Sequence, residues 1–546
     1  MVMVFFMGVS WPAMALTDYS NQLGYDGLQM ARRAGLISRE DYVISRLKSR
    51  FRPQGEDFGS KSSDGGRGGR EITLLLKEAV DYYSTFSAQG REYVDRLLLR
   101  PVSTSNEWPW ADYFVFYLPE TVLTFEPGVS EYPHIGGKYK FWYVTHATPD
   151  GEGTVHTVDP AFLYDVVEAF EASYATEVSE MGYTAPLFDA DLPDNGGDEK
   201  IDVYLMNCGE FGVYGYTVPL NIGSSSTRAS YMVVDNDFSE FVTSTKTAEE
   251  AMQVTVAHEL HHAIQFAINS NTQDWIMEAT STWMESQVYP DIDDNLQYLN
   301  GNDGFFYNTD VPLDDDYQWY NSWIWMEYMT IKWGRDSVHD VWGFLETQSN
   351  SGLAISNVIS QNGSTVKSAF TEFVLKNYSQ VGFYDDAAVY DDVTMENAPG
   401  QTLDYSGFQT HLVTTTQVYV DHLATAYYKF KPGDRITGEN DDSLLIQVYG
   451  ESGYPLNAAV SVKYTDNSFS EYPLSFDVSN NGYVHVNDFN KTEVNEVVLA
   501  LVNYSTSPTA DDASFWVQGG LGLSISNSEN SSSGGCFIES IFGYSN

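Results

Sequence analysis

The sequence predicts an α+β protein in which a small mixed sheet with packed helices is followed by a β-sandwich. From about residue 135 to residue 346, short apolar runs alternate with longer stretches that have helical spacing. From about residue 414 to residue 523, short β-rich runs separated by turn residues follow one another, as is typical of a sandwich. With 546 residues, of which 42% are hydrophobic, the chain can form several packed cores.

Charge divides the chain into two unequal parts. The formal net charge is −48, yet residues 1–100 hold 14 basic and 12 acidic side chains. The remaining residues hold 14 basic and 64 acidic side chains. This acidic excess argues against nucleic acid as a partner, because phosphates would be repelled. The first hundred residues are therefore expected to be a different kind of segment from the rest.

Residues 1–15 are predicted to be a signal peptide. An apolar run from Val2 to Val9 leads to Ala13-Met14-Ala15, a small-x-small cleavage pattern, although no basic residue precedes the run. A buried N-terminal strand is the alternative. No other run approaches the ~20 apolar residues that a membrane span needs. The sequence therefore favours a secreted protein without a transmembrane span, and its two cysteines allow at most one disulfide.

Residues 16–100 are predicted to form helices on either side of the Gly- and Ser-rich stretch 59–70. A mildly basic segment of this kind could be a pro-region that docks on the acidic remainder and covers its cleft. It could equally be a helical subdomain that stays attached. Residues 101–400 are then expected to form the mixed-sheet domain, residues 401–525 the sandwich, and residues 526–546 a flexible tail.

The elements of the mixed-sheet domain follow from their periodicity. Three strands and one helix are expected before residue 247: strands 139–145, 201–206 and 231–235, and helix 160–181. A second helix begins at the capping box Thr247-x-x-Glu250 and continues without Gly or Pro to about residue 268. A third helix is expected to begin with Asp274 as its cap, and residues 285–346 look mainly helical.

The second of these helices carries the pattern H-E-x-x-H as His258-Glu259-x-x-His262. Residues four apart lie on one side of a helix, so both imidazoles can reach one metal ion, and zinc accepts such ligands. The opposite side is apolar and is expected to pack on the sheet: Val256, Leu260, Ala263 and Ala267. His261 points about 80° away from the midpoint of the pair, so a supporting role is expected for it.

A zinc site needs a third protein ligand. Glu278, in the first turn of the helix that follows, could return over the two histidines in a helical hairpin. Glu285 lies seven residues later on the same face and is the competing candidate. Glu278 is preferred because its neighbours Ala279 and Ser281 are small, which allows close packing of the two helices.

His258-Glu259-x-x-His262 followed by W-x-x-E-x-x-S-x-x-x-E resembles the gluzincin metallopeptidases, which include thermolysin-like and hyicolysin-like enzymes. AHELHHAIQF and WIMEATSTWMES are more closely similar to a poorly characterised group of secreted bacterial proteins classed as metallopeptidases. That resemblance covers about residues 135–345, and many members have Gly where this chain has Ala279.

The resemblance implies a zincin-like fold for the mixed-sheet domain and a zinc ion held by His258, His262 and Glu278. It also implies that Glu259 is the general base and proton shuttle, a role that a carboxylate beside the first ligand can fill. By position in the related pattern, Tyr320 is the candidate for stabilising the oxyanion. A packed tyrosine without such a role is the alternative.

Two weaker patterns lie outside this group. Residues 189–202 hold five aspartates around a Gly-Gly turn, which favours either a structural calcium site or a solvated acidic turn. The stretch Gly534-Gly535-Cys536-Phe537-Ile538 resembles the GGGCFIA tails of some secreted bacterial proteins. It would attach the protein to the cell surface through Cys536, or else it is a disordered tail.

Together these observations predict a secreted zinc-dependent endopeptidase that acts on protein or peptide substrates. A surface adhesion or binding protein that keeps the scaffold without turnover is the first alternative. A zinc hydrolase acting on a bond other than a peptide bond is the second.

Overall fold

The computed structural model describes most of the chain, in these ranges: 25–50, 72–101, 121–124, 138–143, 158–190, 192, 195–209, 212–220, 225–395, 416–432, 443–487, 489 and 493–521. The chain forms two compact units, Met1–Thr394 and Met395–Asn546. The expected signal peptide at 1–15 and the expected tail at 526–546, with Cys536, lie outside the described residues.

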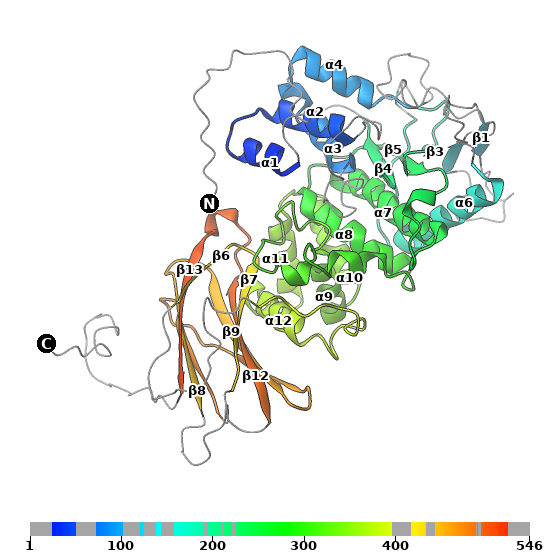
Figure 1. The fold of residues 1–546 in the computed structure, drawn as a ribbon. Helices are drawn as coiled ribbons and strands as arrows, with labels where there is room; N and C mark the ends of the chain where they lie inside the picture. Colours follow the sequence, from blue (N-terminus) through cyan, green and yellow to red (C-terminus); the bar gives the residue numbers. More distant parts are fainter. Residues whose placement is uncertain are drawn as a thin grey trace. The chain divides into compact units, whose positions relative to one another are not determined.

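A five-stranded sheet forms the centre of the first unit (Figure 1). Its order is β1-β2-β3-β5-β4, with bounds Thr121–Thr124, Tyr139–Tyr143, Ile201–Met206, Ser230–Asp235 and Gly215–Pro219. β2, β3 and β5 run parallel, whereas β1 and β4 pair antiparallel at the two edges. Every residue of β3 and β5 is buried, as expected for strands covered on both faces.

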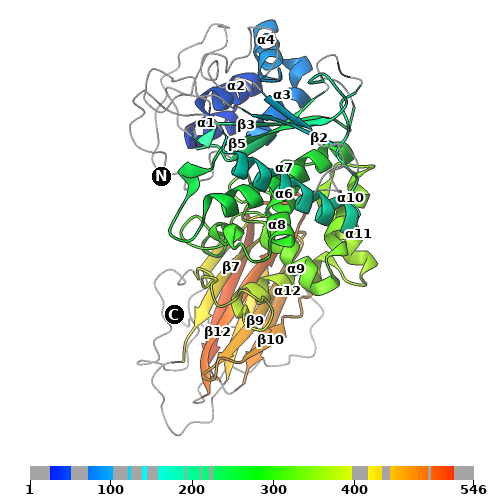
Figure 2. The same cartoon turned by 90° about the vertical axis from the view of Figure 1, so that its right-hand side faces the viewer.

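Helices α6 and α7 cover one face of this sheet (Figure 2). α7 packs on β4 and β5, and it also contacts α6 and α8. The helices of this side and of the lobe that follows are α6 (Pro160–Tyr174), α7 (Ala248–Asn269), α8 (Asp274–Val288), α9 (Trp323–Trp333), α10 (Asp336–Leu345), α11 (Ser351–Gln361) and α12 (Val366–Ser379). Since α7 is surrounded by sheet and helices, all of it beyond the first turn is buried except partly exposed Gln253.

The N-terminal helices cover the other face of the sheet (Figure 2). They are α1 (Tyr25–Arg33), α2 (Arg39–Arg50), α3 (Ile72–Asp81) and α4 (Ala88–Leu97). Leu75 and Leu76 of α3 share one hydrophobic core with Tyr216, Tyr231 and Val233 of the sheet. The N-terminal helices therefore complete the burial of the sheet that positions α7.

The second unit consists of two antiparallel four-stranded sheets with the orders β10-β9-β12-β7 and β11-β8-β13-β6. Their strands are β6 (Thr416–Val420), β7 (Ala424–Phe430), β8 (Leu444–Gly450), β9 (Leu456–Tyr464), β10 (Phe469–Pro473), β11 (Asn481–Val486), β12 (Val494–Asn503) and β13 (Ala513–Leu521). Side chains of both sheets form one hydrophobic core. The α+β prediction with a β-rich C-terminal part is thus confirmed.

Several details differ from the predicted elements. One helical stretch is expected from the sequence at 71–99, whereas the described residues there form two helices, α3 and α4, with a 3-10 turn between them. Asp274 does not cap α8: Gln273 occupies the N-cap position, and the Asp274 carboxylate pairs with Lys77 Nζ at 2.8 Å. Strand β4 and helices α11 and α12 were not predicted. No helix in the described ranges has the length and apolar character that crossing a membrane requires.

Candidate metal centre

The candidate site lies on the packed pair of helices α7 and α8. The predicted capping box begins α7: the Glu250 backbone N–H donates to Thr247 Oγ1 at 3.1 Å, and the Thr247 N–H donates to Glu250 Oε2 at 2.7 Å. Both groups would otherwise be unsatisfied donors at the helix start. The cap fixes the residue at which α7 begins. It thereby also fixes which side chains of α7 face α8.

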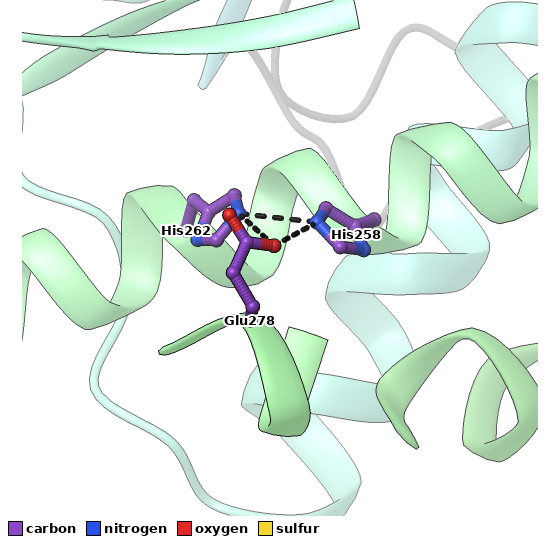
Figure 3. Close-up of side chains that lie close together, drawn as sticks. All are labelled: His258, His262 and Glu278. Carbon is purple, nitrogen blue, oxygen red and sulfur yellow. Dashed lines mark hydrogen bonds and ion pairs between the residues drawn. The ribbon is translucent and has the colours of Figure 1, made fainter. Parts of the chain in front are cut away.

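The structure brings His258, His262 and Glu278 together (Figure 3). The two Nε2 atoms are 3.1 Å apart. Glu278 Oε2 lies 3.1 Å from Nε2 of His258 and 3.5 Å from Nε2 of His262. All three side chains are at most 2% exposed. This buried group, called the metal group below, could hold a metal ion.

The hydrogen bonds of the two Nδ1 atoms show that the Nε2 atoms are the ones left to bind a metal ion. Nδ1 of His258 lies 2.8 Å from Oε1 of Glu285, and a carboxylate accepts this hydrogen bond. Nδ1 of His262 lies 2.8 Å from Oε1 of Gln265. The Gln265 amide nitrogen donates to the Met277 carbonyl at 2.9 Å, which requires the amide oxygen to face His262. When the rings are neutral, as metal binding requires, these hydrogen bonds leave the lone pair of each Nε2 directed at the same point.

These distances fit a zinc ion. Zn–N and Zn–O bonds of about 2.0–2.1 Å in a tetrahedron place neighbouring ligand atoms roughly 3.3–3.4 Å apart. The three observed separations lie on either side of that value. Oε1 of Glu278 is buried and has no hydrogen-bond partner among the described residues. Burying a carboxylate oxygen without a partner raises the free energy of the folded state. A cation bound beside Glu278 would remove that penalty.

Without a metal, the carboxylates of Glu278 and Glu285 favour the protonated form of His258. Burial lowers the pKa of His258, but hydrogen bonds to Glu278 and Glu285 outweigh it and raise the pKa to about 10. Burial raises the pKa of Glu278, but the two histidines outweigh it and bring the pKa to about 2. A metal ion can bind His258 only after that proton leaves, so metal binding is expected to release protons.

Glu259, the predicted base, is 1% exposed and turns towards the edge strand β4. Its Oε2 accepts a hydrogen bond from the Thr217 hydroxyl at 2.8 Å and another from the Thr73 hydroxyl at 3.2 Å. Thr217 belongs to β4, whereas Thr73 belongs to α3 in the N-terminal segment. The carboxylate is thus held beside the metal group without being part of it.

His261 and Tyr320 lie beside the group. Nδ1 of His261 is 2.9 Å from Oε2 of Glu177, a fully buried residue in the π-helical turn Ala175–Glu180. Burial holds the pKa of His261 well below its usual value and that of Glu177 well above it. Tyr320 lies one turn before the start of α9. Its ring stacks on the His258 ring, with the two ring centroids 5.9 Å apart. The oxyanion role of Tyr320 stays a prediction, and Glu177 was not predicted from the sequence.

Glu285 supports His258 instead of competing with Glu278 for the metal group. We expect Glu285→Gln to weaken zinc binding by about 10–100-fold, because a neutral amide still accepts the Nδ1–H hydrogen bond but no longer adds the negative charge that makes the imidazole a better ligand. Competition with a chelating dye would measure the affinity. Exposed Glu249, in the first turn of α7, provides the control. Equal affinities for Glu285→Gln and Glu249→Gln would contradict this role.

The acidic stretch 189–202 is partly described. Arg100 forms ion pairs with Asp189 and Asp202, and all three side chains are at most 1% exposed. Lys140 Nζ lies 2.9 Å from Asp198 Oδ2. Two protein cations thus pair with these three carboxylates. The aspartates at 191 and 194 lie outside the described residues, so calcium binding there stays a prediction.

No curated protein matches the chain. Residues 141–378 match the model of a family described as a family of unknown function (DUF6055), and this match spans all three residues of the buried metal group.

Proposed function

We propose that this protein is a secreted zinc-dependent endopeptidase of the gluzincin type, with a zincin-like first unit and a C-terminal β-sandwich. The observation that carries the proposal is the buried group of His258, His262 and Glu278, with both Nε2 atoms directed at one point. Glu259 lies in the same turn of α7. This set offers three ligands and a separate carboxylate, which is what zinc hydrolysis of a peptide bond requires.

Each residue then has a defined task. A zinc ion held by the three ligands would lower the pKa of a water molecule and polarise the scissile carbonyl. The Glu259 carboxylate would serve as the general base that accepts a proton from the attacking water and returns it to the leaving amine. Glu285 and Gln265 fix the tautomers of His258 and His262, so the ligands are oriented before the metal arrives.

Metal analysis combined with a peptidase assay tests the proposal. We expect one zinc per chain, casein cleavage that stops on treatment with a chelator, and recovery when zinc is added back. Zinc binding without any cleavage would favour the first alternative, an adhesion or binding protein on the same scaffold. Turnover of esters or other non-peptide substrates alone would favour the second.

Tyr320 is proposed to donate a hydrogen bond to the developing oxyanion. We expect Tyr320→Phe to reduce kcat by about 10²–10³-fold with a smaller effect on KM, since the donor acts mainly in the transition state. Steady-state kinetics on a quenched fluorescent peptide would measure both constants. Tyr298→Phe is the matched control, because its ring stacks on Tyr320 at 5.2 Å. A kcat that falls equally in both variants would assign the loss to packing.

A further inference from the structure

Helix α3 brings one side chain of the N-terminal segment to the candidate base. Thr73 is fully buried. Its hydroxyl oxygen accepts a hydrogen bond from the backbone N–H of Thr217 at 2.9 Å and donates to Oε2 of Glu259, 3.2 Å away. A hydroxyl offers one donor and two acceptor positions, so both bonds can form at once. Thr73 therefore bridges the edge strand and the carboxylate.

Two hydroxyls hold the same oxygen of Glu259. The Thr217 hydroxyl donates to Oε2 from β4, and the Thr73 hydroxyl donates to it from α3. A glutamate side chain has several rotatable bonds, and a fixed carboxylate loses less entropy when it acts. Oε1 stands outside this pair of hydrogen bonds, and it is the oxygen available to take a proton.

The position of Thr73 is fixed by its own helix. Lys77 follows one turn later on the same side of α3, and its Nζ lies 2.8 Å from Oδ1 of Asp274 at the start of α8. Asp81 follows after another turn, and its Oδ1 lies 2.9 Å from the Arg228 guanidinium. α3 is thus tied to the first residue of the helix that carries Glu278.

The N-terminal helices also bury one face of the sheet. Tyr204, Tyr216 and Tyr231 lie in the hydrophobic core that the sheet shares with these helices. Removing the helices would expose that apolar face to water, at a large cost in free energy. This argues against a detachable cover and for a segment that stays in place.

We propose that Thr73 is a positioning residue for Glu259 and that the N-terminal segment is a permanent part of the active site. The inference rests on the proposed function for the role of Glu259 as base. It decides between the two interpretations of residues 16–100 in favour of the segment that stays attached.

Variants of Thr73 in the full chain test this proposal. Thr73→Val keeps the shape but removes both hydrogen bonds, whereas Thr73→Ser keeps the hydroxyl. We expect the valine variant to lower kcat about tenfold or more, with KM and zinc content little changed, and the serine variant to restore most of the activity. Thr85→Val is the control, because Thr85 is exposed in the same segment and its hydroxyl bonds only locally, to the Tyr82 carbonyl at 2.7 Å.

Two measurements do not depend on activity. Amide hydrogen exchange in a peptide covering β4 should be faster in Thr73→Val than in Thr73→Ser, because the Thr217 N–H loses its acceptor. The changes in melting temperature caused by Thr73→Val and Glu259→Ala should be non-additive in the double variant.

The outcomes separate the possibilities. An unchanged kcat in Thr73→Val would overturn the positioning role, and a raised kcat would show instead that α3 obstructs the site. If the wild-type protein binds zinc but cleaves no peptide, the proposed function fails. The hydrogen-bond bridge through Thr73 is then tested by amide hydrogen exchange and by the double variant. It would be overturned if the changes in melting temperature were additive and the exchange of β4 were the same in Thr73→Val and Thr73→Ser.

Discussion

Replacing Glu259 by Gln should leave zinc bound at the wild-type ratio while reducing kcat for peptide hydrolysis by about 10²–10⁴-fold. The structure explains why these two effects separate. Glu259 is outside the group of His258, His262 and Glu278 that could hold the metal, and its Oε2 accepts hydrogen bonds from the hydroxyls of Thr73 and Thr217. An amide oxygen can accept the same two hydrogen bonds, so the local fold is kept. An amide cannot take a proton from water, so the chemical step is lost.

Zinc content and cleavage of casein or a fluorescent peptide should be measured on the same preparation. Glu249→Gln is the matched control, since it makes the same chemical change at an exposed position of α7. If Glu259→Gln cleaves casein as fast as the wild-type protein, the base is wrongly assigned. If the variant loses zinc, Glu259 holds the metal site together and is not only a base.

The helix that carries the site could be predicted because its determinants are local. The capping box fixes the start of α7, and the absence of Gly and Pro lets the helix continue to Asn269. Four-residue spacing then places His258 and His262 on one side. Glu278 could be favoured over Glu285 because the small side chain at Ser281 allows close approach, and Ser281 Oγ indeed lies 3.3 Å from His262 Nδ1.

The supporting residues could not be predicted, because their partners are distant in the chain. Thr73 precedes Glu259 by 186 positions, and Glu177 precedes His261 by 84. No periodicity links such pairs, and only the packing of α3 against β4 and of α6 against α7 brings them together. Gln265 is different: it lies three residues after His262 on the same helix, so helical spacing alone could have suggested it.

Charge distribution gave a partial guide to the N-terminal segment. Its excess of basic residues led to the expectation that it would dock on the acidic remainder. Arg33, Lys77 and Arg100 do pair with carboxylates of later segments. The exposed pair of Arg33 contributes little, whereas buried Arg100 pairs with two carboxylates whose burial without a cation would be costly. Net charge could not distinguish these cases, because it does not report burial.

Replacing Glu278 by Ala should reduce zinc affinity by more than the ~100-fold that loss of a supporting hydrogen bond can cause. The change removes the oxygen that lies 3.1 Å and 3.5 Å from the two Nε2 atoms and leaves only two protein ligands. Catalytic zinc sites usually have three protein ligands, so a two-ligand site should exchange its metal readily. Peptidase activity should be lost together with the metal, in contrast to Glu259→Gln, which loses activity alone.

Thermal unfolding with and without zinc would measure this effect without a substrate. A ligand at about 100 times its Kd stabilises the folded state by about 2.7 kcal/mol, so wild-type protein should melt at a higher temperature when zinc is added. Glu278→Ala should show little of that shift, whereas Glu249→Ala should show all of it. Because His258 and Glu278 also interact without metal, the metal-free variant itself should be less stable than the metal-free wild type. A full zinc-dependent shift in Glu278→Ala would mean that the ion binds elsewhere, and the proposed centre would then have to be abandoned.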